Sequence, residues 1–332
     1  MRTVYEPLVP EEQEELFPVV REPKITTMDK KVVIEAAIPG WQPIWWWRDR
    51  GVKNLPPCTI EEQVDAIVEC VKAGASVIHT HPRDPKDCLP QVHAPELLAE
   101  IMDGAFSEVD FITSHHTWSW DFSKSRAADY ISYTKELLER GKGNKYVQTA
   151  LIMSLGEHRE TRPLHTTKSI QEGVKWMEEN NVKPMYSLHG YAIQYLKQAV
   201  FDSGISKWKP YWLAIQMGKH ADDQVFADPW SHIQVINNIQ LVREAIPDSF
   251  IGIHPAGRNW LPITTTGILL GCELIRVGLE DQFWLYPHRD DISQKASDTV
   301  EIVAKITRDL GREVATVKEA RERVGIQLTS KK

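Results

Sequence analysis

The sequence has few cysteines, and their spacing fits neither a redox motif nor a cysteine metal site. No CxxC pair occurs among Cys58, Cys70, Cys88 and Cys272. The N-terminus also lacks the basic segment and apolar core of a secretory signal peptide. We therefore expect four unpaired cysteines, packed as small core residues, in a protein of the reducing cytoplasm.

Three further features are missing, and each excludes a class of protein. No apolar run approaches the roughly 20 residues that cross a bilayer. The formal net charge of −7 argues against a nucleic-acid-binding surface. No GxGxxG or Walker A sequence is present, so any phosphate groups are expected to contact scattered side chains. We expect small-molecule ligands, with neither nucleic acid nor a membrane as partner.

The composition is that of one large globular domain with an extension. Hydrophobic residues make up 42% of the 332 positions and charged residues 26%, so a sizeable core can form without disulfides. Residues 1–30 are acidic, contain proline and show weak periodicity. This segment is predicted to be an N-terminal arm, suited to wrapping a neighbouring subunit. Residues 31–332 are predicted to form the main domain and a C-terminal extension.

Apolar strand patterns alternate with helical patterns along the main domain. Eight strands are predicted, at 32–38, 76–81, 109–114, 146–151, 183–188, 211–216, 250–254 and 273–278. Helical patterns between them include 59–74, 123–140, 169–180, 191–203, 231–245 and 292–310. Continuous apolar strands separated by helices indicate a parallel sheet. Eight units predict an α/β fold of the closed (β/α)8 TIM-barrel type, with a doubly wound open sheet as the alternative.

Polar side chains gather where the predicted strands end. That edge is where barrel enzymes build their active sites. The polar residues at or just beyond these ends are Gln42, His79, His81, Ser114, His115, Thr149, His189, Gln216, His254, Arg258, Glu280 and Asp281.

Two of these residues form an HxH pair at the end of the second strand. The period of two places the rings of His79 and His81 on the same side of the strand. Two imidazoles and one carboxylate from another strand make an open zinc site with a position left for substrate. Manganese, cobalt or nickel suit the same ligands. The alternative is a pair of hydrogen-bonded histidines in a polar barrel mouth.

The last strand supplies the carboxylates. Glu280 and Asp281 are adjacent, so their side chains diverge, and one can bind a metal while the other transfers a proton. Arg276 is placed either to hold Asp281 ionised or to receive a substrate carboxylate, unless it is a structural ion pair at the barrel rim. Arg258 either faces an anionic ligand or lies on the surface. His115 and His116 are interpreted as polar lining.

Four sequence segments together resemble the β-keto acid cleavage enzymes, whose namesake is the 3-keto-5-aminohexanoate cleavage enzyme. They read AAIPG at 36–40, VIHTH with a following arginine at 77–83, GRNWLP at 257–262 and IRVGLED at 275–281. The likeness extends from about Lys31 to near the C-terminus. The HxH and RxGxED motifs carry most of its specificity.

The resemblance implies a zinc-containing barrel that exchanges a β-keto acid with acetyl-CoA, giving acetoacetate and a new acyl-CoA. By motif, the zinc ligands would be His79, His81 and Glu280, and the acid/base dyad would be Asp281 with Arg276. The resemblance also implies a homo-oligomer, taken as a tetramer. Hydroxyls near the substrate would come from Thr113 or Ser114 and from Thr149.

Two departures from the namesake bear on the substrate. Gln42 stands where the namesake has a glutamate, and the segment 187–189 replaces an acidic pattern. Both changes argue against an aminated substrate. Tryptophans at 41 and 45–47 suit a bulkier apolar or aromatic acyl chain, or a cage for a quaternary ammonium; packing against a subunit or the arm is the alternative.

Two other functions remain open at this point. A zinc-dependent hydrolase of the amidohydrolase type also uses HxH in a barrel, and His189, His254 and Asp281 loosely imitate its later ligands. In those enzymes, however, HxH belongs to the first strand, whereas here a strand precedes it. A non-catalytic metal-binding protein would have no need of Arg276 beside Asp281.

Overall fold

Eight parallel strands close into a barrel in the computed structural model, which describes residues 24–40, 42–49, 51, 55–91, 93–157, 162–217 and 230–330. The barrel strands are β1 (Val33–Ala37), β2 (Val77–His79), β3 (Ile112–His115), β4 (Thr149–Ile152), β7 (Lys183–Leu188), β8 (Tyr211–Met217), β9 (Ser249–Pro255) and β10 (Leu274–Val277). Each overlaps a predicted strand. Since β1 pairs with both β2 and β10, the barrel is confirmed and the open sheet is excluded.

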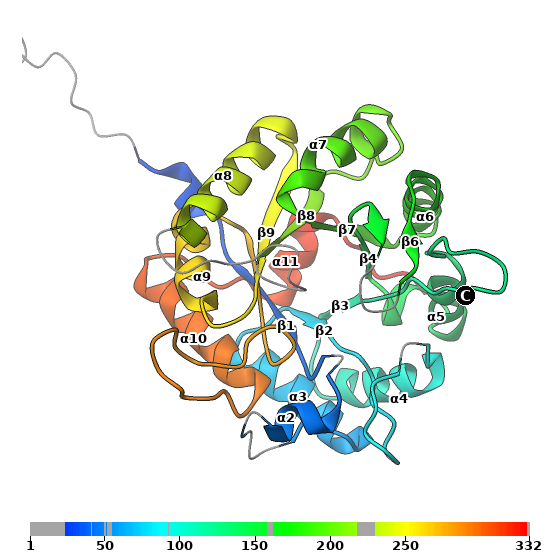
Figure 1. The fold of residues 1–332 in the computed structure, drawn as a ribbon, viewed down its shortest axis with the longest axis horizontal. Helices are drawn as coiled ribbons and strands as arrows, with labels where there is room; N and C mark the ends of the chain where they lie inside the picture. The colour runs from blue at the N-terminus through cyan, green and yellow to red at the C-terminus, as the bar shows by residue number, and fades with distance from the viewer. Residues whose placement is uncertain are drawn as a thin grey trace, which may run out of the picture.

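Helices surround the strands, as Figure 1 shows. The helices that follow successive barrel strands are α3 (Ile60–Ala73), α4 (Pro95–Phe106), α5 (Ser132–Arg140), α6 (Thr167–Glu179), α7 (Ile193–Leu196), α8 (Trp230–Ala245), α9 (Trp260–Leu269) and α10 (Ala296–Asp309). A short α2 (Ile44–Asp49) precedes α3, and α11 (Val317–Val324) follows α10. The order of strand and helix is therefore that of a (β/α)8 barrel.

Helix α3 shows how the local sequence sets the helix ends. Thr59 and Glu62 form a capping box, in which each side chain accepts a hydrogen bond from the other residue's backbone amide. Gly74 ends the helix with a φ of 122°, a conformation that glycine adopts without a Cβ clash. Both ends agree with the prediction.

Other elements differ from the prediction. Helix α5 covers only the second half of the predicted 123–140, because the Asp129 carboxylate accepts hydrogen bonds from the amides of Ile131 and Ser132 and starts the helix there. The predicted helix at 191–203 is α7 continued by a π-helix, Lys197–Asp202. A two-stranded antiparallel hairpin, β5 (Gly156–Glu157) with β6 (Leu164–His165), was not predicted.

The expectation of four unpaired cysteines is wrong for two of them. Cys58 and Cys88 form a disulfide, with their Cα atoms 5.0 Å apart, whereas Cys70 and Cys272 are free and buried. The pair joins the segment before α3 to the loop after β2. Since these loops belong to different strand–helix units, no local spacing reveals the pairing.

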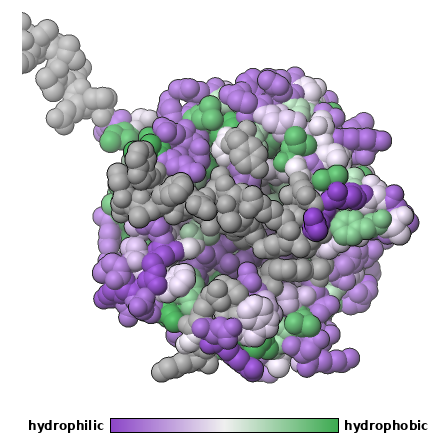
Figure 2. Space-filling view, in the orientation of Figure 1, coloured by the Kyte–Doolittle hydropathy of each residue, from purple (hydrophilic) through white to green (hydrophobic). Residues whose placement is uncertain are grey.

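Helix α11 packs against the N-terminal ends of the barrel strands, which we call the lower end of the barrel. Arg321 on α11 donates hydrogen bonds to the Asp110 carboxylate and the Phe111 carbonyl, just before β3. The site described below lies at the opposite end. Figure 2 shows mostly hydrophilic residues over the outer helices, as expected for helices whose apolar faces cover the barrel.

The predicted arm falls largely outside the described residues, since the description begins at residue 24; a short 3-10 helix, Thr26–Asp29, lies before β1. Within the described part of the chain, no helix is long and apolar enough to cross a membrane.

Candidate metal and acid/base site

The strand register brings four polar side chains to one part of the inner barrel wall. Ala37 at the end of β1 pairs with His79, and Glu35 pairs with Arg276 on β10. Paired residues on parallel strands point to the same face, and alternate residues along a strand point to opposite faces. His79 also pairs with Ser114 on β3, so the same wall continues toward β4.

The three predicted metal ligands converge at the C-terminal mouth of the barrel. His79 Nε2 lies 3.3 Å from His81 Nε2 and 3.3 Å from Glu280 Oε2, and His81 Nε2 lies 3.6 Å from the same oxygen. Both rings are buried. Within the described ranges, these three residues are the group of histidine, cysteine and carboxylate side chains arranged to hold a metal ion.

The spacing of these atoms fits zinc. Ligand atoms about 2.0–2.1 Å from a tetrahedral ion lie roughly 3.3–3.4 Å from one another. The two distances at His79 match this value, and the His81–Glu280 distance is only slightly longer. Three protein ligands leave one tetrahedral position, as in catalytic zinc sites.

Arg276 connects the three candidate metal ligands to Asp281. Its Nε donates to Asp281 Oδ2 at 2.6 Å, and its Nη2 lies 2.7 Å from Glu280 Oε1. Burial alone would lower the pKa of Arg276, but the carboxylates of Asp281, Glu280 and Glu35 outweigh burial and raise that pKa above its ordinary value. The guanidinium is therefore a fixed cation engaged with protein carboxylates, which favours the orienting role over the binding of a substrate carboxylate.

Glu35 also belongs to this group of side chains, although the sequence analysis did not identify it. It is fully buried on β1, and its carboxylate faces His79, Ser114, His254 and Arg276. The signal was a single acidic residue inside the apolar run 32–38.

Two glycines allow the mouth to assemble. A Cβ on Gly40 would lie 2.5 Å from Glu280 Cγ, and a Cβ on Gly278 would lie 2.2 Å from the Ala37 carbonyl oxygen. Arg83 then holds the loop after β1, donating from Nη2 to the carbonyls of Pro39 and Gly40 at 2.9 Å each. Close backbone approach explains the glycine in the RxGxED motif.

The predicted hydroxyls differ in position. Ser114 lies on the inner wall and donates to Glu35 Oε1 at 3.1 Å. Thr149 is its register partner on β4, and Thr149 Oγ1 has no hydrogen-bond partner among the residues that the structure describes. Thr113 points to the other face of β3, where its Oγ1 accepts from the Gln148 amide at 2.8 Å. The structure thus brings Ser114 and Thr149 toward the site and leaves Thr113 out.

Gln42 and Arg258 lie on the same end of the barrel in different settings. Gln42 follows Gly40, and its carbonyl accepts from Arg83 Nη2 at 2.6 Å. Arg258 is half-exposed; it pairs with Asp290 at 2.8 Å and stacks on Trp284, 4.3 Å from the ring centroid. Arg258 therefore holds the loop after β10, and the structure does not bring it to the candidate metal ligands.

The predicted tryptophans differ in burial. Trp47 is fully buried and packs against Phe283, with ring centroids 6.3 Å apart, whereas Trp45 is exposed. Trp41 and the side chain of Trp46 lie outside the described residues.

His115 is on the opposite face of β3 from Ser114. Burial lowers its pKa to about 3, so its imidazole is neutral and lines the barrel wall rather than acting as a proton donor.

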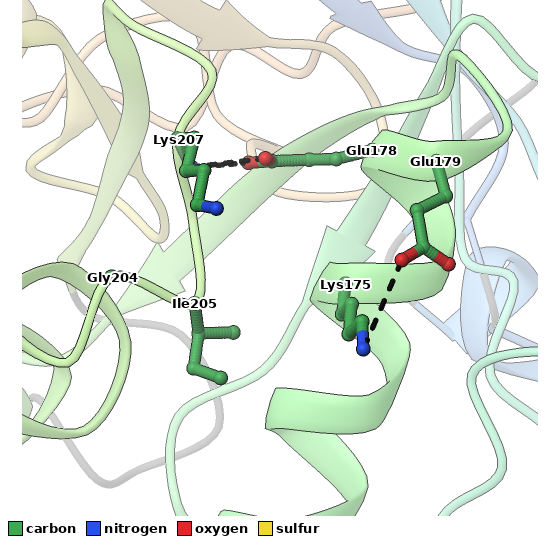
Figure 3. A pocket seen from close by; sticks show the side chains of 6 residues that line it. All are labelled: Lys175, Glu178, Glu179, Gly204, Ile205 and Lys207. Carbon is green, nitrogen blue, oxygen red and sulfur yellow. Dashed lines mark hydrogen bonds and ion pairs between the residues drawn. The ribbon is translucent and has the colours of Figure 1, made fainter.

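A pocket near the end of α6 is unrelated to this cluster. It is lined by residues of α6 and of the segment before β8, and Figure 3 shows Glu178 bonded to Lys207 and Lys175 paired with Glu179. Helix α6 runs antiparallel to the strands, so its C-terminal end lies at the lower end of the barrel. That pocket holds none of the metal-cluster residues.

Solved structures support the fold. The apo structure of ObcA is similar with a TM-score of 0.65 at 17% identity, covering 82% of this chain. The chain spans 65% of the length of that protein. A ternary complex of ObcA with a C4-CoA adduct and oxalate is similar with a TM-score of 0.64 at 16% identity, covering 82% of this chain and 67% of that one.

Two characterised relatives match most of the chain. The 3-keto-5-aminohexanoate cleavage enzyme of Fusobacterium nucleatum is 27% identical over 89% of this chain and 98% of its own. The 3,5-dioxohexanoate:acetyl-CoA acetone transferase of Paraburkholderia graminis is 23% identical over 80% of this chain and 88% of its own. The model of the beta-keto acid cleavage enzyme family matches residues 31–326. The chain therefore belongs to the β-keto acid cleavage enzyme family.

Proposed function

We propose that this protein cleaves a β-keto acid with acetyl-CoA as co-substrate. The acyl group of the β-keto acid passes to coenzyme A, and its carboxymethyl fragment joins the acetyl group to give acetoacetate. Atoms balance in this exchange: one carbon–carbon bond and the acetyl–sulfur bond are broken, and one carbon–carbon bond and one new acyl–sulfur bond are formed. The observation that carries the proposal is the convergence of His79, His81 and Glu280 beside an Arg276–Asp281 pair, in a chain of this family.

Zinc is the ion that we propose for the three ligands. Two imidazole nitrogens and one carboxylate oxygen at tetrahedral spacing favour it. When bound there, the ion would act as a Lewis acid on the keto oxygen of the substrate.

The protein's own groups would supply orientation and proton transfer. Asp281, held by Arg276 at 2.6 Å, is proposed to take up the proton whose removal activates the attacking group, and to return it later. The Thr149 hydroxyl is buried and can donate to a substrate oxygen. Ser114 donates to Glu35 at 3.1 Å in this structure, and its hydroxyl is proposed to donate to a substrate oxygen instead when substrate is bound. Gln42, at the mouth, is proposed to contact the distal part of a substrate without an amino group.

The hydrolase alternative has less support. Its ligand set would require His254 to join His79, His81 and Glu280, and the group arranged to hold a metal ion among the described residues does not include it. Instead, His254 Nε2 lies 3.4 Å from Glu35 Oε2. HxH also ends the second barrel strand here rather than the first. A non-catalytic metal protein would leave the Arg276–Asp281 pair without a role.

We propose that the enzyme is a homotetramer, as the family resemblance implies, and that it works in the cytoplasm. Light scattering of the purified protein gives its mass directly. A monomer would contradict this part of the proposal and leave the chemistry unaffected.

The test is acetoacetate formation from acetyl-CoA across a panel of β-keto acids. We expect activity in the zinc-loaded wild type and a loss of at least about 1,000-fold in Glu280→Ala, since a metal ligand is removed. Glu301→Ala, at an exposed position on α10, is the matched control and should keep full activity. A zinc-loaded wild type without acetoacetate formation on any acid of the panel would contradict the proposal.

A further inference from the structure

Glu35 places a carboxylate in the middle of the barrel wall, where nothing in the proposed chemistry requires one. It is fully buried on β1, within an otherwise apolar strand. Burying a carboxylate is strongly unfavourable unless other groups compensate the charge. An apolar side chain would fill the same position at no such cost. The groups that surround Glu35 therefore indicate what it does.

Four polar groups face this carboxylate, one from each of four other strands, β2, β3, β9 and β10. Ser114 Oγ donates to Oε1 at 3.1 Å, and Arg276 Nη1 lies 3.7 Å from the same oxygen. His79 Nδ1 lies 3.9 Å from Oε1, and His254 Nε2 lies 3.4 Å from Oε2. Two of these residues, His79 and Arg276, belong to the site proposed above.

The two nitrogens of His79 face in opposite directions. Nε2 points to His81 and Glu280, and Nδ1 is on the side of Glu35. An imidazole that binds a metal through Nε2 carries its proton on Nδ1. Glu35 Oε1, at 3.9 Å, is at ion-pair distance rather than hydrogen-bond distance from Nδ1, and its negative charge favours the proton on Nδ1 and makes the ligand nitrogen more basic.

The same carboxylate also bears on Arg276. The guanidinium reaches Asp281 through Nε, Glu280 through Nη2 and Glu35 through Nη1. Glu35 is thus the third acidic neighbour of one cation and the only one of the three that is on a different strand from it, β1 instead of the β10 end. Contact from across the β1–β10 ladder restrains the plane of the guanidinium.

We propose that Glu35 is a positioning residue of the metal site, which orients His79 through Nδ1 and fixes Arg276 from the opposite side to Asp281. This inference rests on the proposed metal site. A residue of the barrel wall beneath the ligands would then contribute to metal affinity.

The first test measures zinc affinity by competition with a chromogenic chelator. Glu35→Gln keeps the size of the side chain and removes its charge, and we expect zinc to bind about 10- to 100-fold more weakly. Glu273→Gln is the matched control, because Glu273 is equally buried but pairs with Lys30 and Arg323 away from the mouth. Its zinc affinity should stay within about twofold of wild type.

A second readout separates positioning from general loss of structure. In the zinc form, the Nδ1–H resonance of His79 in ¹⁵N-histidine spectra should shift in Glu35→Gln and stay unchanged in Glu273→Gln. If Glu35→Gln does not fold, Glu35→Asp keeps the charge and shortens the reach, and we expect intermediate zinc affinity.

The inference is overturned by wild-type zinc affinity with an unshifted His79 resonance in Glu35→Gln, or by wild-type affinity in Glu35→Asp if that variant must be used. Neither measurement requires a substrate. A wild type that binds zinc normally and forms no acetoacetate would therefore contradict the proposed reaction and leave this inference unaffected.

Discussion

Arg276 donates from Nε to Asp281 Oδ2 at 2.6 Å, while its Nη2 lies 2.7 Å from Glu280, a proposed metal ligand. One guanidinium thereby fixes the proposed acid/base group, Asp281, and the proposed metal ligand, Glu280, relative to each other. A planar donor fork holds both carboxylates in a geometry that a lysine would not reproduce.

The first prediction separates the two partners of Arg276. Asp281→Asn should lower kcat by about 100- to 10,000-fold, because the proton acceptor is lost, while zinc affinity changes little. Arg276→Lys should lower both kcat and zinc affinity, because it disturbs Asp281 and Glu280 together. Steady-state kinetics and zinc titration measure the two effects, with Asp309→Asn on the exposed face of α10 as control. A loss of zinc affinity in Asp281→Asn equal to that in Arg276→Lys would argue against separate roles.

The second prediction concerns metal removal. Zinc at about 100 times its dissociation constant should stabilise the folded protein by about 2.7 kcal/mol, since it binds only the folded state. A chelator should therefore lower Tm by several degrees and abolish activity, and added zinc should restore both. Thermal unfolding of His79→Ala should not respond to zinc. An equal zinc response in wild type and His79→Ala would place the ion elsewhere.

Most of the barrel could be predicted from the sequence, because each strand is an apolar run bounded by helical patterns. The same reasoning placed His79, His81 and the pair Glu280 and Asp281 at strand ends, and the family resemblance singled out Glu280 as the third predicted ligand; the structure brings His79, His81 and Glu280 together. Closure of β1 against β10 then brings together residues about 200 positions apart. The start of α5 could not be placed, because the Asp129 side chain sets it rather than the periodicity.

The remainder depends on which face and which loop a side chain meets. Thr113 and Ser114 are adjacent, and only the register shows that Ser114 faces the interior. Arg258 follows a strand as a substrate-binding arginine would, yet a loop acid satisfies it. Cys58 and Cys88 meet because two loops pack together, which no spacing rule reports.

The third prediction tests the close approach at the RxGxED motif. Gly278 has a φ of 131°, and a Cβ there would collide with the Ala37 carbonyl. We expect Gly278→Ala to lower the free energy of unfolding by about 3 kcal/mol, from backbone strain and overpacking together. Urea unfolding measures it. Gly204→Ala, also at positive φ but with open space around it, isolates the strain; an equal loss in both variants would show that the collision is relieved.

The fourth prediction concerns pH. Burial lowers the pKa of Lys183 in the folded protein to about 7, whereas an unfolded lysine titrates near 10.4. Between these values the unfolded chain binds more protons, so stability rises with pH. From pH 7 to 9, Lys183 should contribute a gain of about 2 kcal/mol in the free energy of unfolding.

Urea unfolding at both pH values measures that gain. Lys183→Met should lose it, while Lys207→Met, at an exposed position, should keep it. Parallel pH profiles for wild type and Lys183→Met would show that the Lys183 ammonium stays protonated throughout.

The most direct test of the proposed function follows the acetyl carbons. The zinc-loaded enzyme is given an active β-keto acid and acetyl-CoA with ¹³C at both acetyl carbons, and products are read by NMR and mass spectrometry. We expect acetoacetate with both labels in its acetyl half and a new acyl-CoA without label. Label recovered as free acetate, or unlabelled acetoacetate, would contradict it.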